Sequence, residues 1–145
     1  MLFRSVAYFG QKDYQQSLVI RRMAADLNVP VEVRVCPTVR EPDGLAMSSR
    51  NRYLDPEARR RALVLWQSLN LAGELIRAHQ RDPKVVVARM ESLIGAVSGA
   101  AIDYVALVDP ETLCPLERIE GTALAVLAVR IGGTRLIDNM LIPSA

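Results

Sequence analysis

The chain has 145 residues, of which 50% are hydrophobic and 23% charged, and its formal net charge is +2. These values are typical of a globular protein that can bury a core, and they exclude a disordered chain or one with a strong field for nucleic acid or membrane surfaces. No apolar run approaches the roughly 20 residues that cross a bilayer, and the scattered thiols of Cys36 and Cys114 predict a cytoplasmic protein without a cysteine metal site.

The first part of the chain predicts one strand–helix–strand unit. Residues 6–9 are an apolar run that stops at Gly10, which indicates a buried strand and a tight turn. Apolar positions then recur at helical spacing from about residue 13 to 27, with Asp13 as the N-cap. Valines alternate with charged residues over 31–35, which predicts a second strand. This order is a βαβ unit, the building block of a parallel sheet.

Two helices are predicted after a loop of residues 37–53 that is rich in Pro, Gly, Asp and Ser. Asp55 and Asp82 are each followed by proline, which is the start signal of a helix with an acidic N-cap and proline at its first position. The first helix is expected to run to about His79. The second is expected to end before Gly99.

The last part of the chain predicts an antiparallel sheet. Strand patterns cover residues 102–108, 124–129 and 135–140. Gly132 and Gly133 lie between the last two patterns and are typical of a hairpin turn. Helices followed by such a sheet predict a small α+β domain.

Residues 10–16, at the first strand-to-helix junction, are candidates for binding phosphate. A helix N-terminus offers free amides to an anion, and Gly10 would let the backbone approach a phosphate closely. Lys12 would add a mobile positive charge. Asp13 could cap the helix, touch a ribose hydroxyl or help to position magnesium, and Gln16 could bind a polar substrate. An ordinary turn also favours Gly and Asp, so that alternative stays open.

Residues 47–51 form a second candidate. The hydroxyls of Ser48 and Ser49 could clamp phosphate oxygens, and Arg50 could neutralise charge on a leaving pyrophosphate. A solvated polar loop before a helix is the alternative. Ligands of open parallel sheets lie at the carboxyl ends of the strands. Two motifs near such ends favour an anion site without identifying the reaction.

Other polar features are expected to be structural. The basic run of residues 59–61 has no aromatic platform for stacking bases, so we expect a solvated helix face and no nucleic-acid partner. His79 is expected to be exposed at a helix end, and Trp66 to belong to the core. Asp138 and Asn139 are expected to form structural hydrogen bonds.

The sequence closely resembles the pantoate–β-alanine ligase family from about residue 6 to residue 142. The terminal segment 134–139 is similar to the end of the family. The segments that carry most of the resemblance are residues 6–16, 37–41 and 45–54.

The resemblance implies ATP- and Mg²⁺-dependent condensation of pantoate with β-alanine through a pantoyl-adenylate intermediate. Adenylation is needed because a carboxylate is inert to amines until its oxygen becomes a good leaving group. The implied fold class is α/β, with a partial Rossmann-like nucleotide-binding domain of one βαβ unit over residues 1–38. A small α+β lid domain follows over residues 39–145. The implied partners are pantoate, β-alanine and ATP, with no nucleic acid or membrane, and the family usually forms homodimers.

The resemblance also implies roles for individual residues. Lys12 and Arg50 would be catalytic, stabilising charge on phosphorus and pyrophosphate, and Gln16 would bind pantoate. Residues 47–50 are similar to the family's version of the KMSKS loop, which closes over the phosphates, and no protein ligand of a metal is implied. The residues that would contact ATP are Gly10, Gln11, Lys12, Asp13, Val39 (through its backbone), Met47, Ser48, Ser49 and Arg50.

The sequence departs from the family in one respect. The family pattern includes a histidine motif of the HIGH type, the first strands of the nucleotide sheet and a second pantoate-binding glutamine, and these have no counterpart here. Residues 2–5 do not fit the family and match what a sequencing adapter encodes, which predicts a truncated gene record. We therefore expect weak activity or none. A non-catalytic nucleotide-binding module is the alternative.

Overall fold

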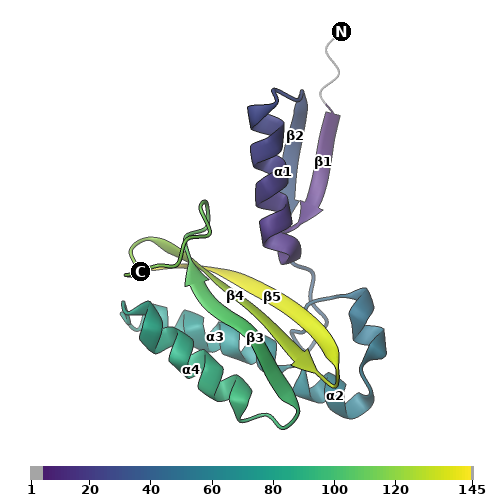
Figure 1. The fold of residues 1–145 in the computed structure, drawn as a ribbon, viewed down its shortest axis with the longest axis vertical. Helices are drawn as coiled ribbons and strands as arrows, with labels where there is room; N and C mark the ends of the chain where they lie inside the picture. The colour runs from purple at the N-terminus through teal and green to yellow at the C-terminus, as the bar shows by residue number, and fades with distance from the viewer. Residues whose placement is uncertain (1–4, 145) are drawn as a thin grey trace. The chain divides into compact units, whose positions relative to one another are not determined.

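The computed structural model describes residues 5–144, and the chain divides into two compact units, residues 1–39 and 40–145 (Figure 1). Of residues 2–5, for which an adapter origin is predicted, only Ser5 belongs to the described part of the chain. Within the described residues, no helix combines the length and the apolar character that a membrane span requires. The fold is of the mixed α/β class, with a parallel pair of strands in one unit and an antiparallel sheet in the other.

The first unit is the predicted βαβ unit. Strand β1 (Ser5–Gly10) pairs in parallel with β2 (Val31–Cys36). A 3₁₀ turn, η1 (Gln11–Asp13), and helix α1 (Tyr14–Asp26) connect the strands. The helix lies alongside the two strands (Figure 1).

The parallel strand pair has one half-covered face and one exposed face. Ala7 and Phe9 lie in register with Val33 and Val35, and all four side chains are half-buried. Tyr8 belongs to the opposite face and is 62% exposed. The prediction of a buried first strand is therefore wrong for the described unit. Two strands and one helix provide too few elements to cover both faces of a sheet.

The second unit is a three-stranded antiparallel sheet with helices along one face (Figure 1). The strands lie in chain order, β3 beside β4 and β4 beside β5. The elements are η2 (Ser49–Tyr53), α2 (Pro56–Arg61), α3 (Val64–Arg77), α4 (Pro83–Gly95), β3 (Ala100–Val108), β4 (Thr122–Ile131) and β5 (Thr134–Pro143).

The core of this unit lies between the sheet and helices α3 and α4. Alternate residues of each strand point to one face, so the inward positions of β4 meet the apolar stripes of both helices. The buried cluster includes Leu65, Leu69 and Ile76 of α3, Val86, Met90 and Ile94 of α4, and Leu127, Val129 and Ile131 of β4.

The single helix predicted from Asp55 to His79 is two helices, α2 and α3. Ala62 and Leu63, between them, keep right-handed helical backbone angles. The amide of Leu63 donates to the carbonyl of Arg60, and the amide of Leu65 donates to that of Ala62. These bonds span three residues instead of four, so the chain tightens locally into a 3₁₀ turn. Apolar spacing continues through such a turn and does not reveal it.

The predicted hairpin turn at Gly132 and Gly133 is present. Ile131 pairs with Thr134, which leaves the two glycines as the whole loop. Their φ angles are +55° and +81°. A two-residue turn with positive φ at both positions suits glycine because it has no Cβ.

Asp55 caps α2 as the Asp-Pro signal predicts. Its carboxylate accepts hydrogen bonds from the amides of Glu57 at 2.9 Å and Ala58 at 2.8 Å. These bonds, chiefly the one from Ala58, hold the pKa of Asp55 below its usual range. Because the folded-state pKa is depressed, the stabilisation is present above the unfolded-state pKa and is lost as the pH falls through the folded-state pKa.

We therefore expect the Asp55→Asn variant to retain the cap but to lose its pH dependence, because asparagine also accepts the amide bonds at an N-cap. The thermal midpoint of Asp55→Ala should lie below that of the wild type at pH 7. The gap should narrow below about pH 4, the ordinary pKa of aspartate in the unfolded chain, because the unfolded state then binds a proton that the folded carboxylate resists. Circular dichroism melts from pH 2 to pH 7 measure both effects. A gap of constant size at every pH would contradict the assignment.

Candidate functional site

The residues predicted to bind phosphate in the first unit lie at the carboxyl edge of the parallel strand pair. Gly10, the last residue of β1, pairs with Cys36, the last residue of β2. The segment of residues 11–13 starts from one strand end, and residues 37–39 start from the other. In open parallel sheets this edge is where ligands bind. Val39, whose backbone is predicted to meet adenine, has a side chain that is 65% exposed.

Gly10 does not form the predicted tight turn. Its backbone is extended, with φ −81° and ψ 135°, which any residue can adopt. A Cβ added at Gly10 would meet no described atom within 4 Å. Within the described residues, neither backbone strain nor a close neighbour explains a glycine here. Another physical reason for a glycine at this position is that it allows a ligand to approach the backbone closely.

Asp13 occupies the N-cap position of α1, but its side chain forms no cap hydrogen bond. Its backbone angles, φ −94° and ψ 60°, lie outside the extended region that is usual for a capping residue. The side chain of Asp13 therefore does not cap the helix as predicted. Asp13 is exposed at the helix start. Gln16, one turn further along, is exposed as well, and Lys12 is half-buried.

The second predicted motif lies in the second unit, where it opens η2. The hydroxyl of Ser48 caps this turn by accepting from the amide of Arg50 at 3.2 Å. A hydroxyl that accepts one bond still has a proton to donate. Met47 is 50% exposed, and Ser49 and Arg50 are exposed. The loop of residues 47–50 thus presents hydroxyls and a guanidinium to solvent, a donor set that suits phosphate oxygens.

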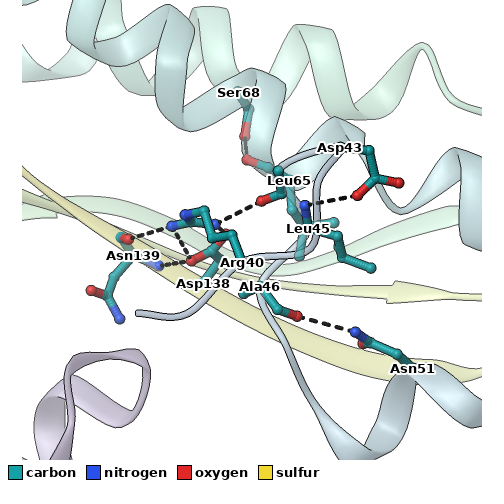
Figure 2. A network of polar contacts seen from close by, with 10 residues as sticks. Arg40, Asp43, Leu45, Ala46, Asn51, Leu65, Ser68, Asp138 and Asn139 are labelled. Carbon is teal, nitrogen blue, oxygen red and sulfur yellow. Dashed lines mark hydrogen bonds and ion pairs between the residues drawn. The ribbon is translucent and has the colours of Figure 1, made fainter. Parts of the chain in front are cut away.

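The base of this loop is held by Arg40, which sequence reasoning missed as a key residue (Figure 2). Its guanidinium forms two bonds with Asp138, of 2.6 Å and 3.0 Å. It also donates to the carbonyl of Gly44 at 3.1 Å and lies 3.9 Å from the ring centroid of Trp66. The exposed fractions of the side chains are 18% for Arg40 and 2% for Asp138. The sequence signal that could have revealed this ion pair is the acidic residue Asp138 at an inward position of its strand, because a buried carboxylate requires a partner.

The basic run of residues 59–61 is the predicted solvated face only at Arg60, which is exposed. Arg59 forms an ion pair with Asp43 at 2.9 Å, and Arg61 donates to the carbonyl of Ser98 at 2.9 Å. Both arginine side chains are 27% exposed. Their partners lie elsewhere in the chain, so the two arginines tether α2 to neighbouring segments.

Comparison with known proteins gives the family. The profile of the family described as Pantoate-beta-alanine ligase matches residues 2–141. This range includes residues 2–5, contrary to the expectation that they do not fit the family. Pantothenate synthetase from Moorella thermoacetica is 57% identical over 136 residues, which are 94% of this chain and 48% of the relative. The pantothenate synthetase of Roseiflexus castenholzii is also 57% identical, with 49% of its length covered. The chain spans about half the length of the curated relatives it matches.

Solved structures agree with the sequence comparison. The crystal structure of pantothenate synthetase from Thermus thermophilus has a TM-score of 0.89 and 47% identity, covering 94% of this chain and 49% of that one. Pantoate-beta-alanine ligase from Francisella tularensis, complexed with beta-gamma ATP and beta-alanine, has a TM-score of 0.63 and 28% identity, covering 94% and 43%. With a family match from residue 2 to residue 141, this chain belongs to the pantoate–β-alanine ligase family.

Proposed function

We propose that this chain carries the ATP-binding residues of a ligase that joins pantoate to β-alanine. A carboxylate oxygen of pantoate attacks the α-phosphorus of ATP, and pyrophosphate leaves. The amine of β-alanine then attacks the acyl carbon, loses a proton and displaces AMP. The family match over residues 2–141, which includes both motifs, carries this proposal. The nucleotide and β-alanine named for the Francisella tularensis relative support it.

Residues of the first unit are proposed to bind the nucleotide and pantoate. The open backbone at Gly10 and the amides at the start of η1 would approach the phosphates, where a helix N-terminus favours negative charge. Lys12 would stabilise charge that builds on the α-phosphorus. Gln16 would hydrogen-bond pantoate, and Val39 would meet adenine through its backbone. In this proposal residues 1–38 are part of a Rossmann-like domain.

Residues of the second unit are proposed to close over the phosphates. Ser48 and Ser49 would donate to phosphate oxygens, and Arg50 would neutralise the pyrophosphate as it leaves. A planar guanidinium is suited to phosphate because it donates two parallel hydrogen bonds. Residues 39–145 would then serve as the lid domain of the enzyme.

Magnesium is proposed to enter with the nucleotide. No group of three or more His, Cys, Asp or Glu side chains that could hold a metal occurs among residues 5–144. Mg²⁺ at nucleotide sites commonly needs one or two carboxylates, with phosphates and water as its other ligands. The exposed Asp13 at the strand edge fits that need. Bound magnesium would supply positive charge to the phosphate oxygens.

Full turnover is proposed to need the histidine motif that the resemblance implies. The single histidine of this sequence is His79, an exposed residue just after α3 with φ +62°. Preorganised donors aimed at a transition state contribute about 3–4 kcal/mol each. The chain alone is therefore expected to bind ATP and to turn it over weakly or not at all.

We expect Lys12→Ala and Arg50→Ala each to weaken binding of MgATP about tenfold, the effect of losing one charge-assisted contact. Calorimetric titration of the purified chain measures this, with circular dichroism to verify folding. Arg60→Ala, which removes an exposed arginine outside both motifs, is the matched control. Pantoate-dependent release of pyrophosphate is measured in parallel.

The outcomes separate the two functions under consideration. ATP binding with pantoate-dependent release of pyrophosphate supports the ligase. ATP binding by the folded chain without release, even when the histidine-bearing part of a relative is supplied, would favour the non-catalytic nucleotide-binding module. A folded chain that binds no ATP in either setting would contradict the assignment of both motifs.

A further inference from the structure

Residues 40–46 form a closed turn at the start of the second unit, which we call the anchor hairpin. Arg40 and Ala46 pair as an antiparallel bridge. The amides of Glu41 and Gly44 donate to the carbonyls of Leu45 and Glu41, each at 2.8 Å. Leu45 and Ala46 are only 2% and 4% exposed. The anchor hairpin is therefore fixed both by its own hydrogen bonds and by burial.

The loop of residues 47–50 is tied at both ends. It leaves the anchor hairpin at Ala46 and enters η2, and the side-chain amide of Asn51 donates back to the carbonyl of Ala46 at 3.1 Å. This bond joins the residue before the loop to the residue after it (Figure 2). The position of the loop therefore depends on how firmly the anchor hairpin is held.

One buried ion pair attaches the anchor hairpin to the sheet. The Asp138 carboxylate lies on β5 and accepts from Arg40 and also from the amide of Asn139 at 2.8 Å. The indole ring of Trp66 covers the Arg40 guanidinium at 3.9 Å. A buried ion pair adds little net stability, because removing both charges from water offsets their attraction. Its two parallel bonds nevertheless fix direction, which an apolar contact does not.

We propose that Arg40, Asp138 and Trp66 are positioning residues that hold the loop of residues 47–50 in place for phosphate binding. We call these three residues the clamp. None of them contacts the nucleotide in this proposal; they act through the anchor hairpin on Ser48 and Arg50. The role rests on the proposed function for the identity of the ligand. The mechanical part of the proposal, that the clamp orders the loop, can be tested without any ligand.

The test compares Asp138→Asn with Asp103→Asn. Both substitutions remove one charge from a strand carboxylate that pairs with arginine. The Asp103 carboxylate is 27% exposed and bonds Arg130 at 3.1 Å and Arg135 at 2.6 Å, and neither of these partners belongs to the anchor hairpin. Hydrogen exchange of backbone amides is measured on the whole chain. The amides of Glu41, Gly44 and Asn51 report on the hairpin and loop, and those of β4 report on the core.

We expect exchange of the hairpin and loop amides to accelerate at least about tenfold in Asp138→Asn, with β4 unchanged, since local opening is independent of global unfolding. Trp66, the only tryptophan, should shift its emission, because the stacked guanidinium moves. Binding of MgATP should weaken about tenfold in the same variant. Asp103→Asn should leave all three measurements unchanged.

Arg40→Lys is the second variant, in case Asp138→Asn does not fold. Lysine keeps the charge but forms neither the two-bond pair nor flat stacking, so it should show the same changes to a smaller degree. Uniform acceleration of exchange in β4 and the loop would overturn the proposal, because the clamp would then be only a stability element. So would a loosened loop with unchanged ATP binding. If the wild type binds no ATP but the loop of the Asp138→Asn variant loosens as expected, the assigned function fails while the mechanical part holds.

Discussion

The Leu69→Ala variant is expected to lose about 2–5 kcal/mol of unfolding free energy in the second unit. Leu69 lies in α3, is fully buried and belongs to the cluster between helices and sheet. Alanine would remove the transfer free energy of three carbons and leave a cavity that neighbouring side chains fill only in part. Urea unfolding followed by the emission of Trp66 measures the loss.

Val85→Ala is the matched control for this substitution. Val85 lies in α4 of the same unit, but its side chain is 41% exposed. We expect its loss to be within about 0.5 kcal/mol, as for most surface substitutions. Equal losses in the two variants would mean that the core does not lie between the helices and the sheet.

The Gly44→Ala variant is expected to lose about 2–5 kcal/mol of unfolding free energy, and this loss has two separate causes. Gly44 has a φ of +98°, and an added Cβ would lie 2.1 Å from Cδ1 of Trp66. The backbone angle strains any L side chain, and the overlap would push the indole away from Arg40. We expect a lower urea midpoint together with a shift in Trp66 emission.

Gly121→Ala separates the two causes. Gly121 has a φ of +81°, but a Cβ there would meet no described atom within 4 Å. Gly121→Ala should lose only the unfolding free energy that comes from backbone strain, about 1–3 kcal/mol. The emission of Trp66 in the folded state should not change. If Gly44→Ala leaves the emission unchanged as well, the indole does not cover the anchor hairpin in solution.

The features that could be predicted from the sequence are those with local causes. The Asp-Pro pairs at Asp55 and Asp82 mark real helix starts, because the cap and the proline act within one turn. The three strand patterns and the glycine hairpin follow from alternation and from backbone freedom. The tightened turn at Ala62 was missed, because a shift from four-residue to three-residue hydrogen bonds leaves the apolar pattern intact.

The features that could not be predicted depend on distant partners. Arg59 and Arg61 were expected in solvent, but their partners lie 16 and 37 residues away in the chain. No spacing rule connects such positions. Similarly, the resemblance predicts phosphate roles for residues 10–16 and 47–50, and the parallel register explains why the first of these segments lies at a strand edge. It could not show that a buried carboxylate holds the base of the second.

The ion pair between Arg40 and Asp138 joins positions 98 residues apart. During synthesis it can therefore form only after residues 47–50 have been made. Asp138 lies in β5, which follows the other described strands in chain order. Contacts of such long range form late, because the chain between them must first be ordered. A nascent chain that ends before β5 would carry the complete motif of residues 47–50 with its base unattached. If the proposed role of residues 47–50 holds, competence to bind phosphate in this unit is expected to appear only after β5 has been synthesised and paired with β4.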